Sequence, residues 1–574
     1  MMAEINYMVG GEAGQGVQTV GFILAKTMSR TKLHVFADQD YESRVRGGHN
    51  FYRVRASDRD VQAISEKVDI LISIDRRSVE LHQTEVKEDG VVIFDRDKLN
   101  AAGIRPASLD IPLEKLAEEM TGNKLMANSV AVGAAIAIAG FSLDILTDVL
   151  REHFAYLGDN VVQENIRAAR AGYDQVRQHS SRLIRSPIAP ATANGKMLLN
   201  GSEAIALGAM AAGCKFMAAY PMTPTSSIME YIAEKGRKYN IVMIQPEDEI
   251  SALNMVVGAA FTGVRAMTAT SGGGFCLMVE ALSLAGMTET PIVAVLGQRP
   301  GPAIGLPTRT EQGELLFAIY AGHGEFPRAV LSPITIDDCF YSTARAFNLA
   351  EKYQTPVIII TDQHLASSYQ TVNRFDLKQV KIDRGQLLSA EEVNRLADYK
   401  RHAFTDSGIS PRAIPLQGDK LVVTDSDEHD ESGHMIEDAE TRTRMMQKRL
   451  KKLDGLRSEV SQPHQEKRQG AELTLIGWGS TYGAINEAAD LLEGAGMKAN
   501  VLQLNQVWPF PAEAVASSLD GNHKSFVVEN NATGQLAQLI RQQTGIKVSG
   551  SILKFDGRPF SPQYIISELE KEAR

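Results

Sequence analysis

The sequence of 574 residues has only three cysteines, and they lie far apart at Cys214, Cys276 and Cys339. No Cys-x-x-Cys pair occurs, so neither a zinc ribbon nor a self-contained iron–sulfur cluster is supported. The apolar or glycine-rich surroundings favour buried free thiols at all three positions. Few and unpaired cysteines are typical of the reducing cytoplasm. We therefore predict a cytoplasmic protein that holds no metal through residues of its own.

Charge of one sign and long apolar runs are also lacking. The 60 Lys and Arg residues against 70 Asp and Glu residues leave a formal net charge of −10, which argues against nucleic acid because phosphate binding requires a basic face. The N-terminus lacks the pattern of a signal peptide. The stretch Ala131–Ala139 is too short for the roughly 18 apolar residues of a membrane helix and predicts a buried helix. We expect a soluble chain that binds neither nucleic acid nor a membrane.

The sequence does contain repeated alternation of short apolar runs with helical patterns, which is typical of parallel sheets with crossover helices. Since 574 residues exceed one hydrophobic core, we predict an α/β protein of three domains with mostly parallel sheets. The segment Ser186–Gly195, rich in Pro, Ala, Thr and Asn, is the clearest linker. The expected boundaries are 1–185, 196–377, an extended connector at 378–470, and 471–574.

The first domain begins with a predicted strand, Ile5–Val9, that runs into glycines at Gly11, Gly14 and Gly16. Their spacing is not that of the Gly-x-Gly-x-x-Gly dinucleotide fingerprint. Two interpretations stay open: an anion bound at a helix N-terminus, or a tight strand-to-helix turn. A second cluster, Glu42–Asn50, places Arg44 and Arg46 beside paired glycines and predicts either a phosphate contact or a solvated loop.

The connector is polar, and its segment Asp425–Glu431 is strongly acidic. His429 and His434 beside these acids allow a metal site as an alternative, but a solvated acidic loop explains the composition without ligand geometry. Met445–Leu456 is expected to be a basic helix. We predict that the connector wraps other parts of the structure and forms no core of its own.

The stretch from Tyr220 to Arg299 contains groups suited to chemistry. Thr223 lies between two prolines that restrain its backbone, so its hydroxyl is held in place. Ser227 and Glu230 fit a capping box for the helix that follows this turn. Arg299 follows the predicted strand Ile292–Leu296, at the end where ligands gather in parallel sheets, and a guanidinium suits a carboxylate.

Three acids, Glu247, Asp248 and Glu249, stand where a strand is followed by the helix Ile250–Ala260. Burial of one carboxyl group at this junction would raise its pKa and let it share a proton with a ring nitrogen of a cofactor. The alternative is that these acids only stabilise the first turn of the helix. Spacing does not choose among the three.

Several of these segments, in this order, closely resemble the α subunit of 2-oxoacid:ferredoxin oxidoreductases. The matching segments are Tyr220–Pro224, Gln245–Glu249, Thr270–Gly274, Gln298–Pro300, Gly305–Gln312, Asp406–Arg412, Glu428–Gly433 and Gly477–Thr481. Enzymes of this family use thiamine diphosphate to convert a 2-oxoacid and coenzyme A into acyl-CoA, CO2 and reduced ferredoxin. The loop Gly11–Gly16 is similar to the family's γ domain. The resemblance implies a Rossmann-like γ domain, a thiamine-diphosphate pyrimidine-binding domain and a transketolase C-terminal-like domain.

The resemblance also implies roles for residues. Glu249 is expected to be catalytic, as the acid that activates the aminopyrimidine. The implied substrate-binding residues are Thr223, Arg299, Thr308 and Arg309. The implied contacts on the pyrimidine side of the cofactor are Pro221, Glu249, Ser271 and Gly272. The implied coenzyme A contacts are Gly11, Gly14, Gln15, Gly16, Arg44, Gly47 and Asn128. Ala13 departs from the family loop, which usually carries glycine there, and weakens the phosphate argument.

The sequence lacks the Gly-Asp-Gly segment followed by Asn that holds thiamine diphosphate through Mg2+, and it lacks the cysteines of a [4Fe–4S] cluster. In this family both features belong to the β subunit. We therefore expect half of an active site, completed in an (αβ)2 heterotetramer that passes electrons to ferredoxin. The run Gly272–Gly274, which first suggests a phosphate cradle, is then expected to leave room for the cofactor ring or for a subunit contact.

The γ–α fusion and the Leu306–Gln312 loop resemble 2-oxoglutarate enzymes, which form succinyl-CoA in the TCA cycle. Arg309 or a β-subunit residue would supply the second cation that the distal carboxylate of 2-oxoglutarate needs. Pyruvate or a branched-chain 2-oxoacid stays an alternative. Two further alternatives are a non-catalytic regulatory protein that binds coenzyme A or a nucleotide, and a self-sufficient thiamine decarboxylase.

Overall fold

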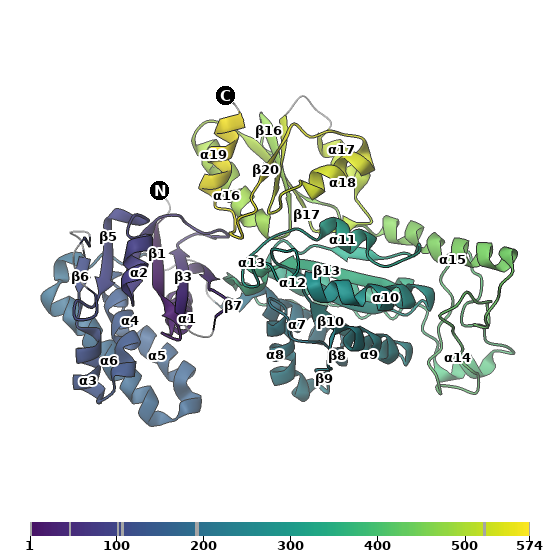
Figure 1. Cartoon of the computed structure of the whole chain (residues 1–574), viewed down its shortest axis with the longest axis horizontal. Coiled ribbons are helices and arrows are strands. Elements are labelled where there is room, and N and C mark those ends of the chain that lie inside the picture. Colours follow the sequence, from purple (N-terminus) through teal and green to yellow (C-terminus); the bar gives the residue numbers. More distant parts are fainter. Residues whose placement is uncertain are drawn as a thin grey trace. The chain divides into compact units, whose positions relative to one another are not determined.

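The structure, a computed structural model, describes residues 3–44, 47–99, 103–104, 108–189, 195–519 and 524–572. Arg46 and residues 190–194 of the expected linker lie outside these ranges. The chain forms two compact units, shown in Figure 1. The first unit comprises residues 1–199, 367–374 and 561–564, and the second comprises 200–366, 375–560 and 565–574.

The first unit is built on a sheet with strand order β6-β5-β4-β1-β3-β2-β14-β7. Its elements are β1 (Glu4–Ala13), α1 (Val17–Arg30), β2 (His34–Asp40), β3 (Gly47–Ser57), β4 (Val68–Ser73), α2 (Arg76–His82), β5 (Val86–Phe94), β6 (Ser108–Asp110), α3 (Leu113–Thr121), α4 (Ala127–Ile138), α5 (Leu143–Phe154), α6 (Asp159–His179), β7 (Met197–Asn200) and β14 (Tyr369–Val372). The apolar run that predicts a buried helix is confirmed as α4, and residues 129–138 of this helix are all buried.

This sheet is mixed. β1 pairs in parallel with β4, as expected from the strand–helix order, but it pairs antiparallel with β3. The segment Glu42–Asn50, predicted as a loop, instead enters β3 at Gly47, and Gly47 lies opposite Ala13. Sequence analysis missed β3 because half of this strand alternates polar and apolar residues, a pattern typical of one solvated face.

The second unit contains a sheet with strand order β18-β12-β13-β11-β10-β8-β9. Its elements are α7 (Gly201–Ala211), β8 (Phe216–Ala218), α8 (Ser226–Lys235), β9 (Val242–Ile244), α9 (Glu249–Phe261), β10 (Ala266–Thr270), α10 (Gly272–Met287), β11 (Ile292–Gln298), α11 (Leu315–Tyr320), β12 (Ala329–Leu331), α12 (Ile336–Tyr353), β13 (Pro356–Asp362) and α13 (Gln363–Ser367). Strands β8, β10, β11 and β13 are parallel, and β10, β11 and β13 are wholly buried. Continuous apolar runs form such strands because helices cover both faces of a parallel sheet.

The capping-box prediction for α8 is wrong. The helix begins at Ser226, its N-cap is Thr225, and no side chain caps it. The hydroxyl of Thr225 instead donates to the carbonyl of Met222 at 2.9 Å. This local bond closes the turn, and such side-chain bonds to nearby backbone compete with capping.

The last part of the second unit carries a sheet with strand order β15-β17-β16-β19-β20. Its elements are β15 (His464–Glu466), β16 (Leu473–Trp478), α16 (Tyr482–Gly494), β17 (Ala499–Leu504), β18 (Gln506–Trp508), α17 (Ala512–Leu519), β19 (Lys524–Glu529), α18 (Gln535–Thr544), β20 (Gly550–Leu553) and α19 (Pro562–Glu572). Strand β18 crosses into the preceding sheet and pairs with β12. The two sheets share one apolar cluster, which includes Leu296, Ile358 and Trp478. The predicted α/β fold with mostly parallel sheets is thus confirmed.

The connector contains the short α14 (Ala390–Arg395) and the long α15 (Ala439–Ser458), and its own apolar cluster is small. A run of charged residues is usually exposed to solvent, but several basic residues of α15 are buried. Lys448 and Lys452 are buried at 4% and 1% exposure, and both pair with the equally buried Glu289, which follows α10. His402 from the connector also bonds Glu289, at 2.9 Å. These ion pairs attach the connector to the rest of the second unit.

Three further expectations concern polar residues. The acidic segment is only partly solvated, because Glu428 accepts two hydrogen bonds from Arg449 and His429 is fully buried. Cys276 is exposed, against the expectation of three buried thiols, whereas Cys214 and Cys339 are buried. Within the described ranges no group of three or more His, Cys, Asp or Glu side chains is arranged to hold a metal ion.

None of the helices described here is both long and apolar enough to cross a membrane.

Candidate functional site

The motifs singled out in the sequence gather at one edge of the second unit's parallel sheet. The Tyr220–Thr225 turn follows β8, Ser271 follows β10, Arg299 follows β11, and β13 ends at Asp362. These strands are neighbours in the order β13-β11-β10-β8, so their carboxyl ends lie side by side. This edge is where ligands bind in open α/β sheets.

The structure separates the three adjacent acids. Asp248 is the N-cap of α9 and accepts from the Ser251 amide at 2.8 Å. Glu247 is exposed and accepts from the Ser251 hydroxyl at 2.6 Å. Glu249 is buried at 4% exposure, and its Oε1 has no hydrogen-bond partner among the described residues. A buried acceptor without a partner is costly, and of the three acids Glu249 is the one in this state.

Two of the three glycines in the Gly272–Gly274 run lie directly against carboxyl groups. A Cβ on Gly274 would stand 2.6 Å from Oε1 of Glu249, and a Cβ on Gly272 would stand 2.3 Å from Oε1 of Glu314. Real Cβ atoms essentially never approach so closely, so alanine at position 272 would displace the Glu314 carboxyl group. Alanine at position 274 would displace the Glu249 carboxyl group, the Thr270 hydroxyl, whose oxygen would stand 2.1 Å from the new Cβ, or both. A Cβ on Gly273 would meet nothing within 4 Å. Only Gly273 therefore faces open space.

Arg299 and Thr223, the two residues expected to bind the 2-oxoacid, contact each other. The guanidinium of Arg299 donates from Nη1 to the Thr223 carbonyl at 2.9 Å, so Thr223 contributes its backbone to this contact. The Arg299 side chain is largely buried, and burial lowers its pKa, while the charge of Glu314 opposes that change. Pro221 is exposed in the same turn, and Ser271 is fully buried, with its Oγ unpartnered among the described residues.

The loop that contains Thr308 and Arg309 is fixed against the last sheet of the unit. Gln312 is fully buried, donates to the Trp478 carbonyl at 2.8 Å and accepts from the Asn530 amide at 3.0 Å. Thr308 is buried. Arg309 lies against Gly557, because a Cβ on that glycine would stand 3.0 Å from the Arg309 Cβ. The loop is thus held at both flanks by the C-terminal part of the chain.

Two acids of this edge were missed by sequence analysis. Asp362 ends β13, is buried at 1% exposure and accepts from the Thr310 hydroxyl at 3.2 Å. Glu314 is partly buried with an unpartnered Oε2, and burial, followed by the charge of Glu311, raises its pKa to about 8. A polar residue directly after a buried strand was a usable signal for Asp362. No sequence feature pointed to Glu314, because an acid before a short apolar helix is usual.

The glycine loop of the first unit is an ordered turn between β1 and α1. Asn128 donates from Nδ2 to the Gln15 carbonyl at 2.8 Å, and the Gln15 Oε1 accepts from the Glu12 amide at 2.8 Å. Gly16 is the N-cap of α1 with φ 81°, and no side chain caps the helix. The first amides of α1 are therefore available to an anion, as at other helix N-termini.

The other residues expected to bind coenzyme A lie near this turn or on the strand beside it. Gly14 and Gly16 have left-handed backbone, and Gly11 pairs with Asn50 of β3. Gly47 lies opposite Ala13 at the start of β3. Arg44 is exposed and pairs with Glu42 at 3.1 Å. The structure thus brings the glycines, Gln15 and Asn128 together, and it places the charge of Arg44 beside an acid.

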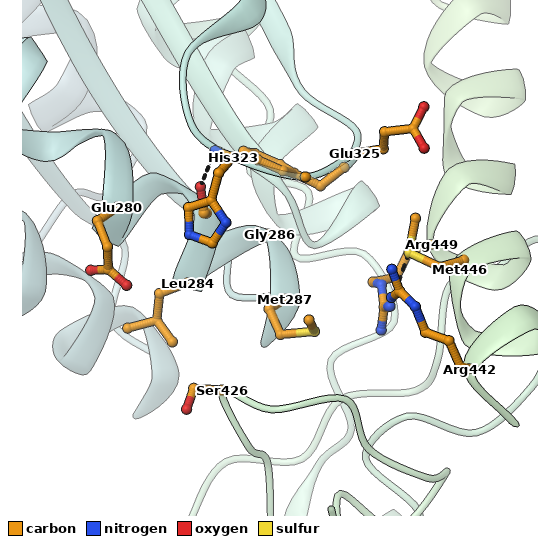
Figure 2. Close-up of a pocket in the computed structure, with 13 residues that line it drawn as sticks. Glu280, Leu284, Gly286, Met287, His323, Glu325, Ser426, Arg442, Met446 and Arg449 are labelled. Carbon is orange, nitrogen blue, oxygen red and sulfur yellow. Dashed lines mark hydrogen bonds between the residues drawn. The ribbon is translucent and has the colours of Figure 1, made fainter. Parts of the chain in front are cut away.

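A cavity of about 230 Å³ lies along the C-terminal half of α10. None of its lining residues belongs to the strand-end site, the group of residues described above at the carboxyl ends of β8, β10, β11 and β13. Figure 2 shows Arg442, Met446 and Arg449 on one side of it and His323, Leu284 and Met287 on the other. Arg449 already makes two hydrogen bonds to Glu428. Arg442 also pairs with Glu428, so both arginines that line this cavity are paired with an acid of the chain.

Comparison with known proteins relates the whole chain to one family. Residues 207–448 match the family "Pyruvate flavodoxin/ferredoxin oxidoreductase, thiamine diP-bdg", residues 6–175 match "Pyruvate ferredoxin/flavodoxin oxidoreductase", and residues 471–565 match "Pyruvate:ferredoxin oxidoreductase core domain II". The 2-oxoacid:ferredoxin oxidoreductase subunit alpha of Sulfolobus sp is 33% identical over 97% of this chain and 95% of its own length.

Two further relatives carry more specific names. The 2-oxoglutarate synthase subunit KorA of Methanothermobacter thermautotrophicus is 33% identical over 66% of this chain and 98% of its own length. The solved structure of 2-oxoglutarate:ferredoxin oxidoreductase from Magnetococcus marinus, with 2-oxoglutarate, coenzyme A and succinyl-CoA bound, is 31% identical. It covers 100% of both chains with a TM-score of 0.91. These matches confirm the resemblance found in the sequence, and the chain belongs to the family of 2-oxoacid:ferredoxin oxidoreductase α subunits.

Proposed function

We propose that this chain is the γ–α subunit of a 2-oxoglutarate:ferredoxin oxidoreductase, which converts 2-oxoglutarate and coenzyme A reversibly into succinyl-CoA, CO2 and reduced ferredoxin. The observation that carries the proposal is the buried, unpartnered Oε1 of Glu249, held beside Gly274 at the strand ends. It is a position for a carboxyl group that shares a proton with a ring nitrogen.

The residues at this edge fit thiamine diphosphate on its pyrimidine side. When bound, the cofactor supplies the carbon nucleophile and the electron sink for decarboxylation. Glu249 would hold a proton at the pyrimidine ring, since its Oε1 has no partner among the described residues. Ser271 and the open face of Gly273 border the same space. Gly274 keeps the carboxyl group in place by leaving room for it.

Arg299 is the cation best placed for the 2-oxoacid carboxylate. It is fixed by the Thr223 carbonyl, and its largely buried position excludes water, which strengthens a charge-assisted bond. A second cation for the distal carboxylate would come from Arg309 or from the partner subunit. The 2-oxoglutarate relatives and the Magnetococcus marinus structure support this substrate over pyruvate or a branched-chain 2-oxoacid.

A β subunit is expected to hold the diphosphate with Mg2+ and to carry the [4Fe–4S] cluster, most simply in an (αβ)2 assembly. Two exposed apolar side chains near the site support a partner. Ile250 is 47% exposed on α9, and Leu277 is 50% exposed on α10, one turn beyond Gly273. Apolar surface around a functional site is typical of protein interfaces. The turn at Gly11–Gly16 with Asn128 is proposed to hold a phosphate of coenzyme A.

The test is co-expression with the β subunit from the same source, followed by anaerobic dye reduction with 2-oxoglutarate, pyruvate and 2-oxoisovalerate in the presence of coenzyme A. We expect the highest kcat/KM for 2-oxoglutarate. Glu249→Gln should lower kcat by about 10²–10⁴-fold, the usual contribution of a positioned acid or base. The matched control is Glu247→Gln, because that neighbouring acid is exposed and bonds only Ser251 in the described residues.

No coenzyme A-dependent reduction with any 2-oxoacid would contradict the proposal. A non-catalytic regulatory protein would instead tolerate Glu249→Ala and would not copurify with β. A higher kcat/KM for pyruvate or 2-oxoisovalerate would keep the family reaction and change the substrate.

A further inference from the structure

Glu314 lies at the strand-end site, although neither the motifs nor the expected roles include it. It precedes α11 and reaches the first turn of α10, because its Oε1 occupies space that a Cβ on Gly272 would enter. Its Oε2 is buried and has no hydrogen-bond partner among the described residues. The carboxyl group therefore lies against the first turn of α10, with one oxygen buried.

The backbone of Glu314 is fixed from β11. Its amide donates to Oε1 of Gln298 at 3.0 Å, and Nε2 of Gln298 donates to the Thr361 carbonyl of β13 at 3.2 Å. Gln298 is fully buried and immediately precedes Arg299. The same strand end therefore holds Glu314 and the arginine expected to bind substrate.

Three charged or titratable groups of the described residues interact with Glu314. Glu311 lies on its own loop, Arg299 lies at the end of β11, and Cys276 lies on α10. Burial raises the pKa of Glu314 to about 8, the charge of Glu311 adds to this, and Arg299 opposes it. At neutral pH the carboxyl group is therefore mostly protonated and does not cancel the charge of Arg299.

We propose that Glu314 is a positioning residue of the 2-oxoacid site, whose charge state decides how strongly Arg299 attracts the substrate carboxylate. Neutral Glu314 leaves the guanidinium to the substrate. Ionised Glu314 competes for Arg299 and repels the anionic substrate. This inference rests on the proposed function, since it needs a 2-oxoacid bound at Arg299.

The sign of the effect follows from the direction of ionisation. Glu314 loses its proton as the pH rises through about 8, while a 2-oxoacid stays ionised throughout. The KM for the 2-oxoacid should therefore rise from pH 7 to pH 9.5, by about tenfold for a nearby unit charge that is partly screened. The kcat should change less, because the charge acts on binding.

The experiment measures KM and kcat of the αβ complex between pH 6.5 and 9.5, with coenzyme A saturating. Glu314→Gln keeps the size of the side chain and removes the ionisation. We expect its KM to stay within about twofold across this range, well below the tenfold rise of the unsubstituted complex. Glu280→Gln is the matched control, since Glu280 is exposed on α10 two turns beyond Gly273. It should keep the tenfold rise.

A second measurement needs no turnover. Burial and then the charge of Glu314 raise the pKa of Cys276, which is exposed on α10. In the full chain, the pH at which Cys276 becomes reactive to iodoacetamide should fall in Glu314→Gln and stay unchanged in Glu280→Gln. Peptide mass spectrometry separates Cys276 from the buried Cys214 and Cys339.

The outcomes separate the two proposals. An unsubstituted complex that turns over no 2-oxoacid contradicts the proposed function, while the Cys276 measurement still reports whether Glu314 ionises near the site. A complex that is active, with a KM rise unchanged by Glu314→Gln, overturns the role of Glu314 and leaves the proposed function intact. A loss of kcat with no change in the pH profile of KM also overturns it.

Discussion

The Oε1 atom of Glu249 lies 2.6 Å from the point where a Cβ atom would stand on Gly274. Glu249 begins α9 and Gly274 lies in the first turn of α10, so two helices that follow different strands meet at a carboxyl group. Since the Thr270 Oγ1 would stand still closer to that Cβ, at 2.1 Å, the missing side chain at Gly274 leaves room for both the Glu249 carboxyl group and the Thr270 hydroxyl.

Gly274→Ala should disturb the Thr270 hydroxyl and the Glu249 carboxyl group, which both border this position. We expect it to lower the kcat of the αβ complex by about 10²-fold or more, because a catalytic group moved by an ångström loses its alignment. The control is Gly258→Ala, since a Cβ on Gly258 would meet nothing within 4 Å. That variant should keep its activity and gain slight stability, because alanine favours helix over glycine. Full activity in Gly274→Ala would contradict this account of the site.

Asn128→Ala should raise the KM for coenzyme A by about tenfold, the cost of one hydrogen bond that holds the loop. Asn128 donates to the Gln15 carbonyl and so fixes the turn before α1. The KM for the 2-oxoacid should not change, and steady-state kinetics with each substrate varied in turn measures both values. Asn123→Ala is the control, because Asn123 is close to Asn128 in sequence but its side chain accepts only from the Leu125 amide of its own short turn among the described residues. An equal rise in both KM values would argue against a coenzyme A contact.

Glu289→Gln should destabilise the second unit by about 3–5 kcal/mol, as expected when a buried ion pair loses one partner. Lys448 and Lys452 would remain buried without the carboxylate that now pairs with both. Asp454→Asn on the same helix removes an exposed pair with Arg457 and should change stability by less than about 1 kcal/mol. Urea unfolding followed by circular dichroism measures both. Equal midpoints for the two variants would show that the buried network adds no stability.

Glu314→Gln should stabilise the chain at alkaline pH. The folded state raises the pKa of Glu314 from 4.5 to about 8, so folding favours the protonated form, and the stability of the unsubstituted chain falls as the pH rises between these values. The variant cannot ionise, and its advantage should reach about 1 kcal/mol or more at pH 9. Thermal unfolding of both chains at pH 5, 7 and 9 measures the difference. An advantage that does not grow with pH would mean that Glu314 titrates normally.

Much of the fold could be predicted because its cause is local. Val293, Val295 and their neighbours form a continuous apolar run, and such a run forms a buried strand wherever helices cover both faces of a sheet. The alternation of these runs with helical patterns then implied parallel sheets. Strand β3 escaped prediction because its half-solvated pattern is weaker. The pairing of Trp508 in β18 with β12 was not predicted, because pairing between segments far apart in the sequence leaves no local sequence pattern.

The sequence by itself determined the family, the order of the motifs and the presence of acids, glycines and an arginine at strand ends. The family resemblance already pointed to Glu249, but only the tertiary structure separated it physically from its neighbours, since burial is a property of the packed chain. Asp248 caps a helix, Glu247 is solvated and Glu249 is buried. The tertiary structure also decided that Gly272 and Gly274 make room for Glu314 and Glu249. Residues 272 and 314 are distant in sequence, and only the close packing of α10 against the loop before α11 brings their atoms into the same space.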